Sequence, residues 1–121
     1  LEILSFEFQS TKDIKQAIQL LSTESGLSSW LGKLAKFDFR QGAKLRYSDE
    51  SHGATFALIQ IPKRFVVVAE TLGEVDIKIK EQKSGYTLSL TVKRALLPEE
   101  LEIWQQDVAR IAQVFSGVAN G

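Results

Sequence analysis

The sequence predicts an α+β fold in which a curved antiparallel sheet wraps around a long C-terminal helix. Three observations lead to this prediction: an alternating segment followed by two short helical ones, a long central run of alternating segments, and a closing amphipathic helix. Strands that are grouped, and do not alternate with helices, are typical of α+β proteins. The expected order is one strand, two helices, six strands and one helix. The length of 121 residues fits one domain, residues 1–121.

The first strand and both short helices are expected within the first 32 residues. Residues 3–8 alternate between apolar and polar side chains, as a half-buried strand does. Residues 10–13 have the form of a capping box, which predicts the start of a helix. Apolar residues then recur at helical spacing: Ile14, Ala17, Ile18 and Leu21. A second short helix carries Leu27, Trp30 and Leu31 and is predicted to end at Gly32.

The central part of the chain is predicted to be a meander of strands joined by short turns. Glycine, proline or polar residues separate segments in which apolar side chains alternate with polar ones. The predicted strands are residues 36–40, 43–47, 54–61, 64–72, 74–80 and 87–93.

The last helix carries the strongest helical pattern. Pro98 suits the first helical position, where its missing N–H has no cost, and two glutamates follow at the positive end of the helix dipole. The helix is predicted to end near Gly117. One apolar stripe runs along it, formed by Leu101, Trp104, Val108, Ile111, Ala112 and Phe115.

Several segments resemble the AHSA1-like branch (activator of Hsp90 ATPase homologues) of the START-like or Bet v 1-like helix-grip superfamily, also called SRPBCC. The segment LLSTESGLSSWLG (20–32) is similar to the end of that family's helix pair. The segments FDFRQGAKLRY (37–47) and GATFALIQIPKRFVVVAE (53–70) resemble its glycine-turn and proline-turn strands. The last strand and helix, 85–94 and 97–115, are also similar. The resemblance implies a helix gripping a sheet around a cavity for apolar ligands, without a cofactor.

A cavity between the sheet and the last helix would be lined by the inward-facing side chains. Tyr47 is the expected polar contact for a ligand, because a buried phenol needs a hydrogen-bond partner. The alternative is that the same bulky side chains contact one another and form a filled core. The expected lining residues are Trp30, Phe37, Phe39, Leu45, Tyr47, Ile77, Leu88, Leu90, Trp104 and Val108.

The two strands around Pro62 carry apolar residues on both faces. Regular alternation would place Ala57, Ile59 and Ile61 on one face and Leu58 on the other. A sheet with one solvated face does not have this pattern. A second copy of the chain is one explanation, and the predicted homodimer interface comprises Phe65, Val66, Val67 and Val68.

The composition argues against several classes of function. Fifteen basic and fifteen acidic residues give no overall field for nucleic acid, and no apolar run has the length of a membrane span. The absence of cysteine fits a cytoplasmic protein without disulfides. Asp49, Glu50 and His52 share one polar loop, which is weak support for a metal site, so neither a metal nor a cofactor is expected.

The leading interpretation is a non-catalytic domain that binds an apolar small molecule or lipid. One alternative is a protein-interaction module of the co-chaperone type, for which the basic run Lys33, Lys36, Arg40, Lys44 and Arg46 could dock an acidic partner. The other is a cyclase-like or hydrolase-like enzyme. An enzyme needs an ionisable side chain in the cavity, and the candidates are Tyr47, Arg64 and Glu70.

Overall fold

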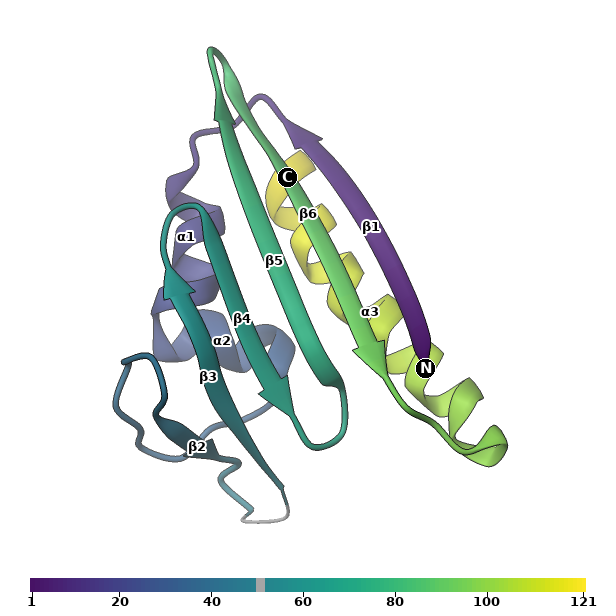
Figure 1. The fold of residues 1–121 in the computed structure, drawn as a ribbon. Helices are drawn as coiled ribbons and strands as arrows, with labels where there is room; N and C mark the ends of the chain where they lie inside the picture. The colour runs from purple at the N-terminus through teal and green to yellow at the C-terminus, as the bar shows by residue number, and fades with distance from the viewer. Residues whose placement is uncertain (50–51) are drawn as a thin grey trace.

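The computed structural model describes residues 1–49 and 52–121 and confirms the helix-grip fold class (Figure 1). One strand is followed by two short helices, five strands, a short 3-10 turn and a long helix. The helices are α1 (Lys15–Ser22), α2 (Glu24–Leu31) and α3 (Leu101–Asn120), and the 3-10 turn η1 (Pro98–Glu100) leads into α3. The strands are β1 (Glu2–Ser10), β2 (Lys44–Arg46), β3 (Gly53–Gln60), β4 (Arg64–Ala69), β5 (Gly73–Gln82) and β6 (Gly85–Arg94).

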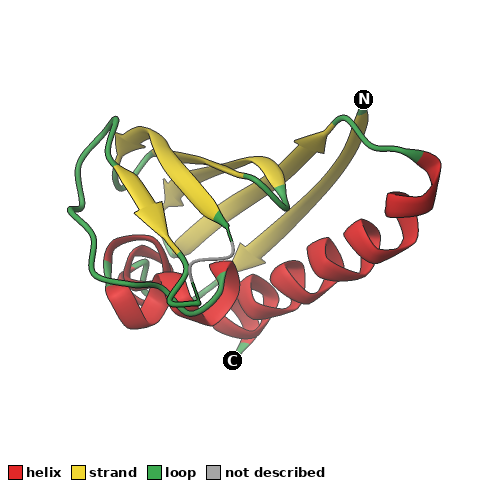
Figure 2. Ribbon diagram, turned by 90° about the horizontal axis from the view of Figure 1, so that it is seen from below, coloured by secondary structure: helices red, strands yellow, loops and turns green. Residues whose placement is uncertain are grey.

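The strands form one antiparallel sheet in the order β1-β6-β5-β4-β3-β2. All three helices lie on the same side of this sheet, which curves around them (Figure 2). The side that faces the helices is called the concave face here, and the opposite side the convex face.

Cross-strand pairs of apolar residues build the concave face. Leu90 on β6 lies opposite Phe6 on β1 and Ile77 on β5, and Phe65 on β4 continues the row. Leu90, Ile77 and Phe65 are fully buried against the helices. Because side chains alternate along a strand, the polar residues between them face outward on the convex side. The alternation in the sequence therefore determines which face of the sheet packs against the helices.

Trp30 on α2 connects the sheet with α3. Its ring centroid lies 6.5 Å from that of Phe65 on β4 and 5.4 Å from that of Phe115 on α3. The indole N–H donates a 2.8 Å hydrogen bond to the carbonyl of Leu20 on α1. The fully buried side chain of Trp30 therefore contacts the sheet, α3 and α1.

The predicted start of the first helix is wrong by several residues. The helix begins at Lys15, and the carboxylate of Asp13 accepts a 2.8 Å hydrogen bond from the Lys15 N–H. Ser10 does not cap the helix, because its hydroxyl donates to the carbonyl of Ala119 at the end of α3. Its oxygen also accepts from the N–H of Lys12.

Two other boundaries also differ from the predictions. Residues 36–40 form a loop and not a strand, so five strands follow the helix pair where six were expected. Phe37 and Phe39 alternate in the sequence because both rings pack onto Phe56 of β3. The last helix continues beyond Gly117 to Asn120.

No helix in the described part of the chain combines the length and the apolar composition that crossing a bilayer requires.

The pattern around Pro62 has a local cause. A β-bulge between Phe56 and Leu58 shifts the register, so that Phe56 lies opposite Val67 while Leu58 lies opposite Val66. The prediction that Ala57 and Ile59 share a face is therefore wrong. An extra residue in one strand reverses the alternation beyond it. Ile59 now pairs with Phe65 on the concave side, and Leu58 faces the convex side.

Replacing Trp30 with alanine tests its role in the core. We expect Trp30→Ala to lower the free energy of unfolding by about 3–5 kcal/mol, measured by urea denaturation, because the change leaves a large cavity. Ile103→Ala is the matched control: this side chain is 66% exposed and its loss should change stability by about 0.5 kcal/mol or less. Similar losses in both variants would contradict the central role of Trp30.

Candidate functional site

The expected cavity-lining residues are mostly packed against one another. Trp30, Leu45, Ile77, Leu88, Leu90, Trp104 and Val108 are buried in one hydrophobic cluster. Phe37 and Tyr47 are partly buried and pack against this cluster, and Phe39, at 39% exposed, stacks on Phe65. The indole N–H groups of Trp30 and Trp104 donate to the carbonyls of Leu20 and Leu72. These donors are satisfied within the chain, so they do not require an interior ligand.

A hollow of about 510 Å³ opens beside Trp104, where the first turns of α3 pass the end of the sheet. It lies at one end of the interface between the sheet and α3, and it is called the mouth here. Its wall combines the β4–β5 turn, the end of β6 and one side of α3. The lining residues are His52, Glu70, Thr71, Arg94, Glu99, Glu100, Ile103, Trp104 and Asp107.

Hydrogen bonds fix one side of the mouth. The guanidinium of Arg94 donates to the Thr71 carbonyl at 2.7 Å and to the Glu100 carboxylate at 3.1 Å. The other oxygen of Glu100 accepts from the N–H of Leu97 at 2.9 Å, which caps the start of η1. Arg94 and Glu100 therefore neutralise each other and join the end of β6 to the turn that begins α3.

The remaining charges of the mouth are mainly negative. His52 and Glu70 lie 3.4 Å apart and are both well exposed, with side chains 47% and 65% accessible. Glu99 and Asp107 form no ion pair with any residue that the structure describes. Glu99 is also explained by the positive end of the helix dipole, which favours acidic residues there. Asp107 lies in the second turn of α3 and Glu70 comes from the β4–β5 turn, so the dipole explains neither of them.

Tyr47 stands next to the mouth. Its ring lies 6.4 Å from that of His52 in an edge-on arrangement. Burial raises the pKa of the Tyr47 phenol above its ordinary value, and the smaller influence of a hydrogen bond from the Thr71 side chain acts in the opposite direction. Glu70 raises this pKa further and Arg110 lowers it, so both charged groups lie near the phenol.

Local backbone structure places Tyr47. Gly32 ends α2 with a φ of 123°, a conformation that favours glycine, and a β-carbon at this position would lie 3.5 Å from the Tyr47 ring. The backbone of Tyr47 forms a bridge with Leu34 just beyond α2. The N–H of Tyr47 donates to the carbonyl of His52, which holds the two residues together.

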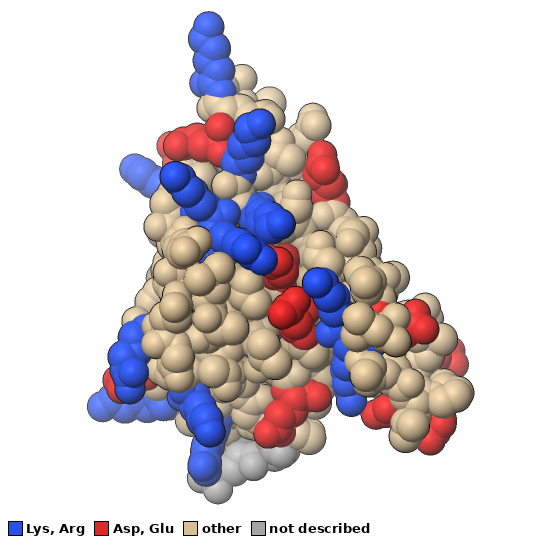
Figure 3. Space-filling model, in the orientation of Figure 1, with Lys and Arg blue, Asp and Glu red and all other residues tan. Residues whose placement is uncertain are grey.

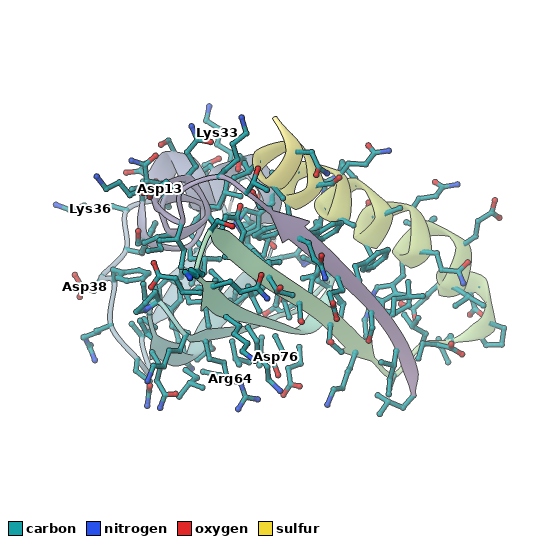
Figure 4. The ribbon with its side chains drawn as sticks, turned by 90° about the horizontal axis from the view of Figure 1, so that it is seen from above. Asp13, Lys33, Lys36, Asp38, Arg64 and Asp76 are labelled. Carbon is teal, nitrogen blue, oxygen red and sulfur yellow. The ribbon has the colours of Figure 1, made fainter. Side chains whose placement is uncertain are left out.

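Of the ionisable candidates for the cavity, Glu70 lines the mouth and Tyr47 lies beside it, whereas Arg64 lies elsewhere. Arg64 lies on the convex face, where its guanidinium donates to both carboxylate oxygens of Asp76 at 3.1 and 2.8 Å (Figure 4). Three residues of one polar loop were weak candidates for a metal site. Of these, Asp49 and His52 are described, and Glu50 lies outside the described residues. Sequence reasoning missed Thr71, Arg94 and Asp107. The feature of the sequence that could have indicated this site is the excess of acidic residues at the N-terminal end of the last helix.

The four predicted dimer residues lie on opposite faces of β4. Phe65 and Val67 face the helices and are fully buried, so they cannot contact a second copy. Val66 and Val68 face the convex side, and of these only Val68 is well exposed, at 43%. The homodimer stays a prediction, restricted to Val66 and Val68.

No protein-family model matches this chain, and no curated protein matches it in sequence. Solved structures match over nearly its whole length. The Aha1 dimer from Colwellia psychrerythraea has a TM-score of 0.69 at 9% identity, covering 98% of this chain and 97% of that one. The AHSA1-like protein from Aeromonas hydrophila has a TM-score of 0.58 at 16% identity, covering 97% and 95%. A protein from Mesorhizobium loti has a TM-score of 0.71 at 10% identity, covering 97% and 96%.

The fold is therefore that of the AHSA1-like helix-grip proteins, which confirms the resemblance seen in the residues. At these identities the similarity concerns the fold alone.

The raised pKa of Tyr47 has a consequence for stability at high pH. The unfolded chain loses its phenol proton near pH 10, whereas the folded chain retains it to higher pH. The stabilisation is complete below about pH 10, and we expect it to be lost as the pH rises through the pKa of the folded protein. Urea denaturation of the wild type and Tyr47→Phe between about pH 8 and 11 measures this. The difference in stability between them should change with pH, and a constant difference would contradict the assignment.

Proposed function

We propose that this chain is a non-catalytic binding domain that holds an apolar small molecule with a cationic or hydrogen-bond-donating group in the mouth. The observation that supports this most is the hollow of about 510 Å³ between α3 and the end of the sheet. Its volume lies within the range of roughly 300–1,000 Å³ that is usual for small-molecule sites.

The wall of the mouth fits a ligand with an apolar body. Trp104 lines the hollow although it is almost fully buried, and Ile103, which also lines it, is exposed. Contact of a ligand with Ile103 would remove apolar surface from water on both partners, which is the main source of affinity for such ligands. The interior beyond Trp104 is occupied by packed side chains, so we place the ligand at the mouth and not deep in the core.

The charges of the mouth favour a positive or donating group on that ligand. Arg94 is already bound to Glu100, which leaves Glu70, Glu99 and Asp107 as acceptors around the hollow. A carboxylate gains from a nearby cation, and the gain increases when the contact excludes water.

We favour binding over catalysis for this site. The pair His52 and Glu70 is the nearest arrangement to an acid–base catalyst, but both side chains are exposed to solvent. General acid–base catalysis depends on a group whose position and pKa are set by its surroundings. Burial raises the pKa of Tyr47, which lies beside the mouth, further from neutral pH.

Titration with short amphiphiles tests the proposal. We expect octylamine to bind about tenfold more tightly than octanoate, measured by isothermal titration calorimetry, because the two share a chain of similar length and differ in charge. In the double variant Glu70→Gln, Asp107→Asn, which keeps only Glu99 as an unpaired acid of the mouth, this preference should become weaker.

A control variant, Glu7→Gln, Glu81→Gln, makes the same change in charge on β1 and β5, away from the mouth, and should keep the preference. Equal binding of the two amphiphiles to the wild type would contradict the proposed ligand class. Binding of neither would contradict the site itself.

A further inference from the structure

The convex face of β3 and β4 has an apolar centre that no other part of the described chain covers. Thr55 lies opposite Val68, and Leu58 lies opposite Val66. Val68 is 43% exposed, which is unusual for a valine in the interior of a sheet. Figure 3 looks onto this face and shows an uncharged area over β3 and β4 with Lys and Arg side chains above and below it.

A hollow of about 400 Å³ lies beside Val68 at the edge of this surface. Val68 and Thr55 contribute apolar and hydroxyl surface, and Lys44 and Arg46 of β2 contribute the cations. Glu70 also lines the hollow, and the remaining lining residues are Leu45, Gly53, Ala54 and Ala69. An exposed apolar side chain, a concave shape and two basic side chains therefore occur together on one face.

Lys44 and Arg46, like Lys78 on the convex face of β5, lack the acidic partner that Arg64 and Lys93 have among the described residues. Arg64 is bound to Asp76, and Lys93 lies 3.6 Å from Glu74. Neither Lys44 nor Arg46 forms an ion pair with a residue in the described ranges. Lys33 and Lys36 of the predicted basic run do not join them, because these two side chains point away from the face that carries Arg64 and Asp76 (Figure 4).

We propose that this convex surface binds an acidic segment of a partner protein, with its carboxylates on Lys44 and Arg46 and an apolar side chain on Val68. Opposite charges at the rim of an interface favour the correct partner and speed its association. The surface shares Glu70 with the mouth, but Lys44, Arg46 and Val68 do not line the mouth, so the proposal does not depend on small-molecule binding there.

Two other occupants fit the surface less well. In a symmetric dimer the surface meets its own copy, and each chain would bring Lys44 and Arg46 against one Glu70, so the interface would carry an excess of positive charge that opposes association. Single-stranded nucleic acid needs aromatic side chains on which bases stack. The exposed aromatic ring of Phe39 lies against Phe56 and Phe65, on the concave side, and not beside Lys44.

Fluorescence anisotropy with a labelled acidic peptide, in which leucines are spaced among glutamates, tests the proposal. We expect the double variant Lys44→Glu, Arg46→Glu to bind this peptide at least about tenfold more weakly than the wild type at low salt. The matched control Lys33→Glu, Lys36→Glu makes the same change in net charge on the other side of the molecule and should bind within about twofold of the wild type. All four side chains are exposed, so both variants should fold, and circular dichroism checks this.

Three results would overturn the proposal. Equal weakening in both double variants would show that only net charge matters. Equal binding of a peptide with serines in place of the leucines would exclude an apolar contact at Val68. Light scattering that finds a dimer in the wild type and a monomer in Val68→Lys would assign the surface to a second copy.

Discussion

The packing of Trp30 between the sheet and the last helix is the interaction on which the rest of the structure depends. A curved sheet and one long helix leave space at the side of the helix, and the helix pair fills it with this side chain. Its ring contacts Phe65 and Phe115, and its N–H is satisfied by the Leu20 carbonyl. Because the interior is filled in this way, an open hollow remains at the end of the helix–sheet interface, where Trp104 reaches the surface of the mouth.

Charge is distributed unevenly in a molecule whose total charge is zero. Acidic side chains of α3 and Glu70 surround the mouth, whereas Lys44 and Arg46 occupy the convex side of the same end of the sheet. The two sites therefore favour ligands of opposite charge. Each site also contains an apolar contact, Ile103 at the mouth and Val68 on the convex side, so charge selects the class of ligand and apolar burial supplies affinity.

The sequence predicted the fold because its main signals are local and periodic. Alternation identified the inner faces of β5 and β6, and the stripe on the last helix identified its buried side. Residues 36–40 alternate for a different reason, since Phe37 and Phe39 reach the core from a loop. The extra residue at Ala57 was missed because a bulge depends on pairing with the neighbouring strand. The mouth was missed as a whole, because Glu70, Arg94 and Asp107 are far apart in sequence and meet only when the sheet closes on α3.

The hydrogen bond from Ser10 to the carbonyl of Ala119 has a mechanical consequence. It joins the end of the first strand to the end of the last helix, so the two chain ends lie at opposite ends of β1 (Figure 1). A force that pulls Leu1 and Gly121 apart therefore acts along β1. The nine paired positions between β1 and β6 would carry this load together, in shear, and would not open one after another. In this direction the edge strand of the sheet therefore resists extension through all nine of its pairs at once.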